Sequence, residues 1–98
     1  MPYTIELLTS AKRELREARK WYESQRTGLG ADFNLCIEEA IERVGHDPES
    51  YPIVLDDIRQ LLVRRFPYAI NYFVENDTII VIAVFHASRD PEEWIRRH

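Results

Sequence analysis

An unbroken apolar run from Ile79 to Phe85 constrains the fold of this chain more than any other feature. Such a run is typical of a central β-strand that is covered on both faces. It follows an apolar stretch from Tyr68 to Glu75, and the polar pair Asn76-Asp77 between the two indicates a tight hairpin turn. The chain therefore needs a sheet around this hairpin and further elements to cover it.

Two amphipathic helices precede the hairpin and can cover such a sheet. Residues 11–25 predict a first helix, with Arg13 and Glu17 as an ion pair on its wet side. Gly28-Leu29-Gly30 breaks this pattern, and a second helix follows until Gly45 and Pro48 stop it. The apolar stripes are Ala11, Leu15, Ala18 and Tyr22 in the first helix and Phe33, Ile37, Ala40 and Val44 in the second. Both stripes need a sheet to bury them.

The remaining segments complete the sheet. Residues 3–8 predict a strand that ends at Thr9-Ser10, either of which can cap the first helix. Residues 53–55 predict an edge strand, and residues 58–66 predict a strand with charges mixed in. Pro91 predicts the start of a short C-terminal helix. The predicted fold class is α+β, with an N-terminal strand and a two-helix hairpin packed on a small antiparallel sheet.

Length and composition indicate a single domain over residues 1–98. The 98 residues, 45% hydrophobic and 31% charged, have room for one modest core. The single Cys36 excludes an internal disulfide, and with three scattered histidines it argues against a zinc site, so we expect no metal and no cofactor. The longest apolar run is far shorter than the ~20 residues that span a bilayer. We therefore expect no membrane association and a cytoplasmic location.

The charge distribution limits the class of partner. The net charge is -4 and neither half of the chain is basic, whereas nucleic-acid binders usually carry a basic surface that neutralises phosphates. The chain is therefore not expected to bind DNA sequence-specifically on its own. Local clusters remain that can grip one phosphate or one acidic side chain. They are Arg59, Arg64 and Arg65 in one predicted strand, and Arg89, Arg96 and Arg97 in the tail.

Several short motifs extend over nearly the whole chain, and their order and spacing are informative together. They are Ala-x-x-Glu-Leu-x-x-Ala at residues 11–18, Trp21-Tyr22-Glu23, Gly28-Leu29-Gly30 with Phe33, the Pro48 to Pro52 stretch, Arg65-Phe66-Pro67-Tyr68-x-Ile70-x-Tyr72, and His86-x-x-Arg89-Asp90-Pro91-x-x-Trp94. In these motifs the chain resembles the RelE/ParE superfamily of toxins from type II toxin–antitoxin modules, often described as plasmid stabilisation proteins. The resemblance implies a growth inhibitor that a cognate antitoxin neutralises, and we expect that antitoxin to be encoded beside it.

The resemblance implies one of two targets. RelE-like members are ribosome-dependent endoribonucleases that cut mRNA, whereas ParE-like members inhibit DNA gyrase and are not hydrolases. The nuclease branch commonly has an arginine in a Tyr-Arg-Leu/Ile-x-Tyr motif, and this chain has Ala69 in that place. The missing cation and the acidic balance favour a ParE-like inhibitor. A RelE-like mRNA endoribonuclease and a non-toxic antitoxin-binding scaffold remain as alternatives.

Two candidate catalytic residues follow the apolar strand. RNA cleavage needs a proton carrier and a cation that stabilises the charge developing on the phosphate. His86 can be the proton carrier, and its structural alternative is a hydrogen-bonded histidine at a strand end. Arg89 resembles, by its spacing from Tyr72, a basic position of the nuclease branch. Its structural alternative is an ion pair with Asp90 or Glu93 that anchors the tail.

Arg65 completes the predicted site. Arg64 and Arg65 are expected on opposite faces of one strand, so at most one of them joins the site. Because the strands at 68–75 and 78–85 pair with each other, we expect Arg65 to lie near His86 and Arg89 and to form an anion site with them. The predicted target-binding residues are Arg59, Arg65, Arg89 and Trp94. For Trp94 the alternative is packing on the sheet, which is also the prediction for Trp21 and Tyr22.

Overall fold

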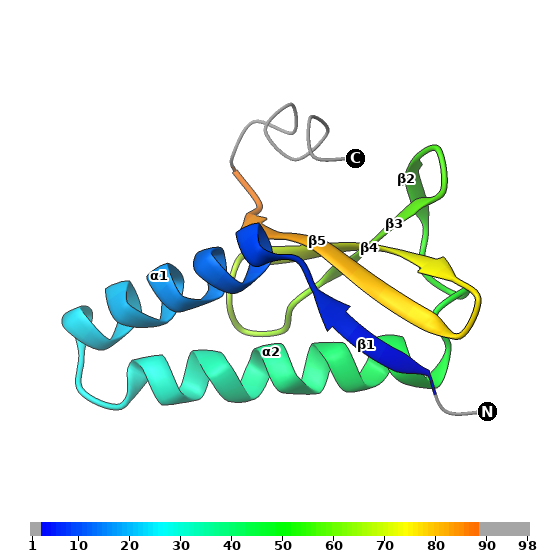
Figure 1. Cartoon of the computed structure of the whole chain (residues 1–98). Coiled ribbons are helices and arrows are strands. Elements are labelled where there is room, and N and C mark those ends of the chain that lie inside the picture. The colour runs from blue at the N-terminus through cyan, green and yellow to red at the C-terminus, as the bar shows by residue number, and fades with distance from the viewer. Residues whose placement is uncertain (1–2, 89–98) are drawn as a thin grey trace.

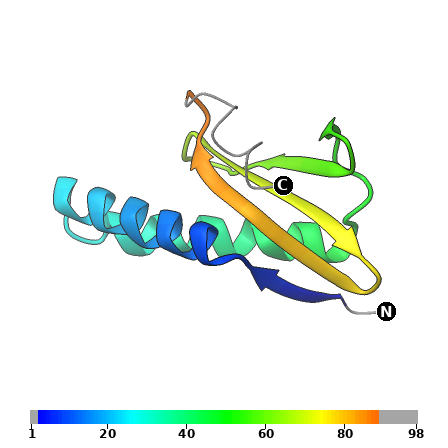
Figure 2. The same ribbon diagram turned by 45° about the horizontal axis from the view of Figure 1, so that its top comes forward.

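Two helices lie against one face of a five-stranded sheet. A computed structural model describes residues 3–88. The elements in chain order are β1 (Thr4–Leu7), α1 (Thr9–Gln25), α2 (Leu29–His46), β2 (Ile53–Leu55), β3 (Ile58–Leu62), β4 (Tyr68–Glu75) and β5 (Thr78–His86). Figure 1 shows α1 and α2 side by side with α2 passing beneath the strands, and Figure 2 shows the β4–β5 hairpin crossing in front of α2. The predicted α+β fold is confirmed, and the predicted helix at Pro91 lies outside the described residues.

The strands lie in the order β1-β5-β4-β3-β2. From β2 to β5 neighbouring strands are antiparallel, as the sequence predicted, and Asn76 takes a φ of 56° in the turn between β4 and β5. The β1 strand instead pairs in parallel with β5, with Thr4 opposite Thr78, so the sheet is mixed. The helix hairpin between β1 and the other strands provides the long connection that a parallel pair needs.

A β-bulge at Ile82 explains why the apolar run does not alternate. Asn71 pairs with Ala83 and Tyr72 with Val81, so Ile82 has no partner in β4. As a result Ile82 and Ala83 both belong to the hydrophobic cluster on the face away from the helices, whereas Val81 belongs to the cluster beneath them. A strand that is buried on both faces and carries a bulge has no polar position to reveal its period.

Phe33 occupies the centre of the core between the helices and the sheet. It is fully buried, and its ring stacks on Tyr22 of α1 with centroids 5.1 Å apart. The rings of Phe66 and Tyr68 form T-shaped pairs with it at centroid distances of 5.2 Å and 5.0 Å. Aromatic pairs of this kind add about 0.5–1.5 kcal/mol each beyond the area they bury. The predicted apolar stripe of the second helix is confirmed, since all four of its members are buried.

A glycine turn holds the two helices together. Gly28 takes a φ of 91°, a left-handed conformation that favours glycine. The N–H groups of Gly28 and Gly30 both donate to the carboxylate of Glu23 at 3.0 Å, and these two bonds hold the pKa of Glu23 below its usual value. A Cβ on Gly30 would lie 2.8 Å from the carbonyl oxygen of Arg19. The glycine therefore permits the close approach of α1 and α2.

Two local predictions are wrong. The α1 helix begins at Thr9 with no side-chain cap, so neither Thr9 nor Ser10 caps it. The β3 strand ends at Leu62 rather than Phe66, because Arg65 adopts a φ of 73° that a strand does not allow. The chain turns inward there and buries Phe66, and the Val63 N–H closes the loop by donating to the Tyr68 carbonyl at 2.9 Å.

Candidate functional site

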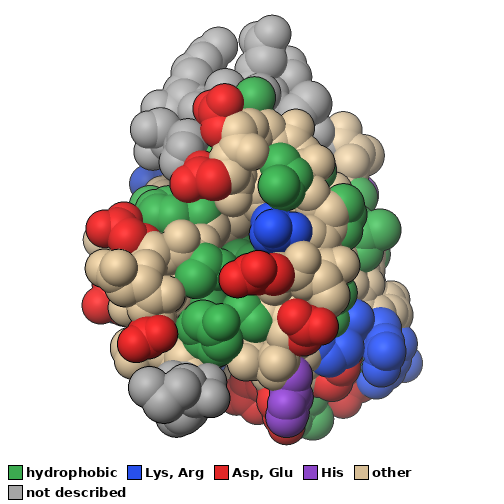
Figure 3. Space-filling view, turned by 90° about the vertical axis from the view of Figure 1, so that its right-hand side faces the viewer, with side chains coloured by type: hydrophobic (Ala, Val, Ile, Leu, Met, Phe, Trp, Pro, Cys, Tyr) green, Lys and Arg blue, Asp and Glu red, His purple; other side chains and the backbone are tan. Residues whose placement is uncertain are grey.

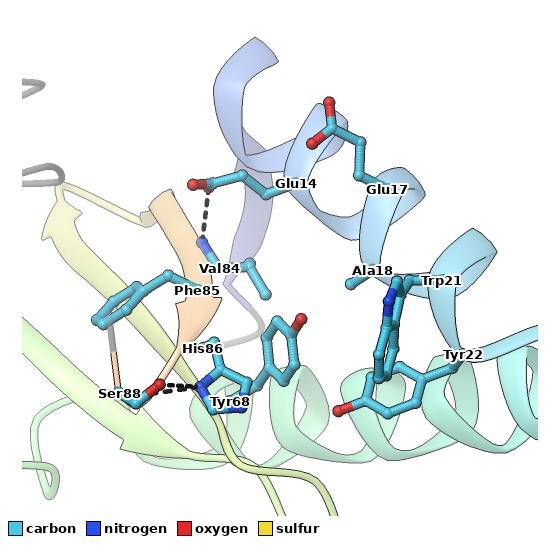
Figure 4. A pocket seen from close by; sticks show the side chains of 10 residues that line it. All are labelled: Glu14, Glu17, Ala18, Trp21, Tyr22, Tyr68, Val84, Phe85, His86 and Ser88. Carbon is cyan, nitrogen blue, oxygen red and sulfur yellow. Dashed lines mark hydrogen bonds between the residues drawn. The ribbon is translucent and has the colours of Figure 1, made fainter. Parts of the chain in front are cut away.

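A pocket of about 560 Å³ lies between α1 and the ends of β4 and β5. Figure 4 shows its walls. The α1 wall consists of Glu14, Glu17, Ala18, Trp21 and Tyr22. The opposite wall consists of Tyr68, Val84, Phe85, His86 and Ser88. The strand end that the sequence indicated as a site is therefore hollowed, and helix α1 faces it.

Glu14 ties α1 to the sheet at this pocket. It lies one turn after Ala11 and one turn before Ala18, on the buried face of the helix, and is buried with them. Its carboxylate accepts a hydrogen bond of 3.0 Å from the backbone N–H of Val84. A buried carboxylate needs such a partner because desolvation penalises a charge left without one. The bond therefore fixes how α1 lies against β5.

Beyond the end of β1, the side chains of Ser10 and Glu14 form the hydrogen bonds to the edge of β5 that a neighbouring strand would form. The last backbone bond on that edge is donated by Leu8 to the carbonyl oxygen of Val81 at 3.0 Å. Farther along β5, Ser10 donates its hydroxyl to the carbonyl of Ile82 at 3.5 Å, and Glu14 accepts from Val84. Side chains one helical turn apart thus satisfy backbone groups on alternate residues of β5.

His86 lies on the sheet wall beside Tyr68, its partner in the β4–β5 ladder, with ring centroids 5.4 Å apart. The backbone N–H of Ser88 donates to Nδ1 of His86 at 3.2 Å, and the Ser88 hydroxyl lies 2.7 Å from the same nitrogen. Because a backbone N–H can only donate, Nδ1 is an acceptor, and the proton of the neutral ring lies on Nε2. The structural alternative for His86, a hydrogen-bonded histidine at a strand end, is thus present in the structure.

Arg65 does not line the pocket that contains His86. Its guanidinium lies 3.8 Å from the carboxylate of Asp32 on α2 and 5.8 Å from the ring centroid of Phe66. Arg64 also turns to α2, where it lies 3.5 Å from Glu39. The sequence predicted Arg65 near His86; in the structure Arg65, which has a left-handed backbone conformation, turns to α2 and is not among the residues that line the His86 pocket. Arg89 and Trp94 lie outside the described residues.

Arg59 has a structural use within the fold. Its Nη1 donates to the carbonyl oxygens of Glu49 and Tyr51 at 2.9 Å and 2.7 Å. Tyr72 lies opposite Arg59 in the sheet and donates its hydroxyl to the carbonyl of Pro48 at 2.6 Å. Together these two side chains fasten the loop between α2 and β2. Burial raises the pKa of Tyr72 to about 12, so its hydroxyl keeps its proton at neutral pH.

Ala69 is buried in the hydrophobic cluster on the face away from the helices, where it pairs with Phe85. The described residues of that cluster are Leu55, Ile58, Ala69, Phe73, Ile80, Ile82, Ala83 and Phe85. A polar pair accompanies them, because the side-chain amide of Gln60 donates to Oδ1 of Asn71 at 3.0 Å. The side chain of an arginine at position 69 would have to pass between apolar side chains to reach a phosphate in solvent.

The end of the molecule that carries β2 and β3 mixes apolar and acidic side chains (Figure 3). On the β2 strand, Ile53 and Val54 are 54% and 41% exposed. Figure 3 shows carboxylates spread over this face and most of its Lys and Arg side chains gathered at one edge. Over residues 3–88 no helix is long and apolar enough to cross a membrane, and no cluster of side chains there can hold a metal ion.

Sequence reasoning missed Glu14, Glu17 and Trp21 as site residues. Trp21 was expected to pack on the sheet, yet it is 57% exposed at the pocket. The predicted pair of Arg13 and Glu17 forms at 3.8 Å, and it places Glu17 on the solvated side of the pocket wall. One signal was available, since the glutamate at position 14 lies directly beside the apolar stripe of a helix that must pack on a sheet.

Comparisons with known proteins agree with the fold. Residues 5–91 match the family described as ParE toxin of type II toxin-antitoxin system, parDE. Among curated proteins, none matches the chain significantly. A structure of a chromosomal ParDE system from P. aeruginosa has a TM-score of 0.75 at 14% identity, over 88% of this chain and 97% of that one.

Two RelE structures are also similar in fold. The isolated E. coli RelE toxin gives a TM-score of 0.66 at 20% identity, over 97% of each chain. The RelBE2 toxin–antitoxin complex from Mycobacterium tuberculosis gives 0.60 at 20% identity, over 88% of this chain and 99% of that one. The RelE/ParE resemblance drawn from the sequence motifs is confirmed. Because the family match covers most of the sequence, the chain belongs to the ParE toxin family of type II toxin–antitoxin systems.

Proposed function

We propose that this toxin acts in the cytoplasm by binding DNA gyrase, and that a cognate antitoxin neutralises it. The observation that carries the choice of target is the apolar surrounding of Ala69. In the nuclease branch an arginine is expected in that place, and here the residue is an alanine, which supplies no cation and is buried in an apolar cluster. The family match and the acidic net charge support the same choice.

The chemical requirements of RNA cleavage also favour DNA gyrase over mRNA as the target. Attack by a 2′-hydroxyl needs a proton carrier together with a cation that stabilises the charge developing on the phosphate. The pocket has His86 as a possible proton carrier, but Glu14 and Glu17 stand on its opposite wall. Carboxylates repel a phosphate, so they disfavour binding of an RNA backbone in this pocket. Inhibition by binding needs neither group.

Purified toxin is expected to block DNA supercoiling by gyrase and to leave ribosome-bound mRNA intact. The toxin would be titrated into a supercoiling assay and, in parallel, into translating ribosomes with mRNA analysed by primer extension. The His86→Ala variant is expected to inhibit gyrase as the wild type does, since binding uses no proton carrier. Cuts at codon positions that need the ribosome would overturn the proposal, and inactivity in both assays would favour an antitoxin-binding scaffold.

Arg65→Ala is expected to reduce toxicity and to change the free energy of unfolding by less than about 1 kcal/mol. The side chain is 63% exposed and its ion pair with Asp32 is open to water, so the fold depends little on it. Growth after induction and urea unfolding would be measured. Arg64→Ala is the matched control, because Arg64 is as exposed and pairs with Glu39 instead. Equal toxicity of the two variants would remove Arg65 from the target surface.

Arg59 is left out of this proposal because its guanidinium holds two backbone carbonyls within the fold. For Arg89 and Trp94 a role in target binding remains a prediction from the sequence.

A further inference from the structure

The pocket beside α1 combines aromatic rings with carboxylates. Trp21 and Tyr68 supply rings, Glu14 and Glu17 supply carboxylates, and no Lys or Arg of residues 3–88 lines it. In Figure 4 the rings of Trp21 and Tyr68 stand on either side of Ala18, whose small side chain leaves the space between them open. A guest in this space meets aromatic rings at its sides, and the carboxylates of Glu14 and Glu17 lie farther along the α1 wall of the same pocket.

Both groups at the mouth of the pocket are accessible to a partner. The Glu17 side chain is 69% exposed, and its contact with Arg13 at 3.8 Å lies in water, where it is screened. Trp21 is 57% exposed, yet its ring is held edge-on against Tyr22 at 5.0 Å and 83°. A large aromatic side chain that is exposed but fixed in orientation is typical of residues that dominate binding energy at interfaces.

We infer that this pocket seats an arginine side chain of the antitoxin. A guanidinium is planar, stacks on indole and phenol rings, and pairs with a carboxylate through two N–H groups. Lysine fits less well because its ammonium is compact and strongly hydrated. The chain has a net charge of -4, which also favours a basic segment as the guest.

The antitoxin is the partner that suits this chemistry, and the inference rests in that respect on the proposed function. The residues proposed to reach the target are cationic, and Arg65 lies outside the pocket, where it pairs with α2. A target surface that complements those cations is acidic and would be repelled by Glu14 and Glu17. The acidic pocket is therefore assigned to the second partner that a toxin–antitoxin module requires.

The test measures how tightly the full-length toxin binds the antitoxin encoded beside it, by isothermal titration calorimetry. Trp21→Ala is expected to weaken binding by at least roughly tenfold, as for a central aromatic contact. Glu17→Gln is expected to weaken it by roughly threefold, because one exposed charge is lost. Leu35→Ala and Glu42→Gln are matched controls on α2, exposed like the pocket residues but outside the lining, and both are expected to bind as the wild type does.

A second measurement identifies the guest. Each arginine of the antitoxin is changed to alanine and combined with Trp21→Ala in a double-mutant cycle. One arginine is expected to be coupled to Trp21. Its change to alanine then weakens binding to the wild-type toxin but causes little further weakening of binding to the Trp21→Ala variant. Thermal melting of the toxin variants confirms that they fold, which is expected because Trp21 and Glu17 are both exposed.

The outcomes separate the two proposals. If the wild-type toxin binds the antitoxin but both pocket variants bind equally well, or if no arginine is coupled to Trp21, the pocket assignment is overturned and the proposed function stands. If the variants keep antitoxin binding and lose inhibition of gyrase, the pocket belongs to the target and the assignment is again overturned. If the wild type does not bind the antitoxin at all, the antitoxin part of the proposed function fails.

Discussion

Phe33→Ala is expected to lower the free energy of unfolding by about 3–5 kcal/mol, the cost of removing a large aromatic side chain from a packed core. Phe33 is fully buried and touches three other rings, from α1, β4 and the loop after β3. Its loss leaves a cavity where the helix hairpin meets the sheet. Domains of this size are stable by about 5–15 kcal/mol, so the variant should be close to unfolding at 37 °C.

Urea unfolding followed by circular dichroism measures this effect. Leu35→Ala is the control on the same helix, because Leu35 is 63% exposed and its truncation is expected to change the free energy of unfolding by less than about 0.5 kcal/mol. A change below about 1 kcal/mol for Phe33→Ala would contradict the aromatic cluster as the centre of the core.

Tyr72→Phe is expected to cost about 1–3 kcal/mol of unfolding free energy, because it leaves the buried carbonyl of Pro48 without its donor. The change keeps the ring and its packing. Comparison of urea unfolding curves at pH 7 measures the cost, with Tyr3→Phe as the control, because Tyr3 is only partly buried at the edge of the core. A difference no larger than that of the control would show that the hydroxyl bond does not fasten the loop.

The same variant tests the alkaline stability of the fold. Burial raises the pKa of Tyr72 from 10.0 to about 12, so the unfolded chain loses this proton at a lower pH than the folded protein does. The contribution of Tyr72 to stability is therefore complete below pH 10 and is lost as the pH rises from about 10 to 12. Tyr72→Phe should remove that part of the alkaline loss. Burial also raises the pKa of Tyr22, but Tyr22 is present in both proteins and cancels in the comparison.

Local patterns in the sequence predicted most elements, because each has its own periodicity and turn residues. The stripe beginning at Phe33, the edge strand at 53–55 and the turn at Asn76-Asp77 all appear in the structure. The partner of β1 was not predictable, because nothing local in residues 3–8 specifies whether that strand adds to β5 or to the opposite edge of the sheet. The bulge at Ile82 was equally hidden, since every residue around it is apolar.

The site was less predictable than the fold. The positions of Arg65 and His86 follow from one left-handed residue and from hydrogen bonds in the turn after β5, and neither has a strong sequence signal. The role of Glu14 depends on Val84, which is distant in sequence and is brought close by the sheet. Carboxylates on an amphipathic helix ordinarily indicate its solvent-exposed face. Only the structure could show that Tyr68 lies across a pocket from Glu14 and Glu17.

The attachment of α1 to β5 has a consequence for how the toxin is made. Glu14 and Val84 are 70 residues apart, and β1 also depends on β5 for its pairing. While the ribosome is still adding the last strand, the N-terminal strand and helix have no sheet edge to join, and contacts this distant in sequence form late. Chains that stop before β5 are therefore expected to lack the native structure, and a folded toxin is expected only once β5 has been made and can pair with β1.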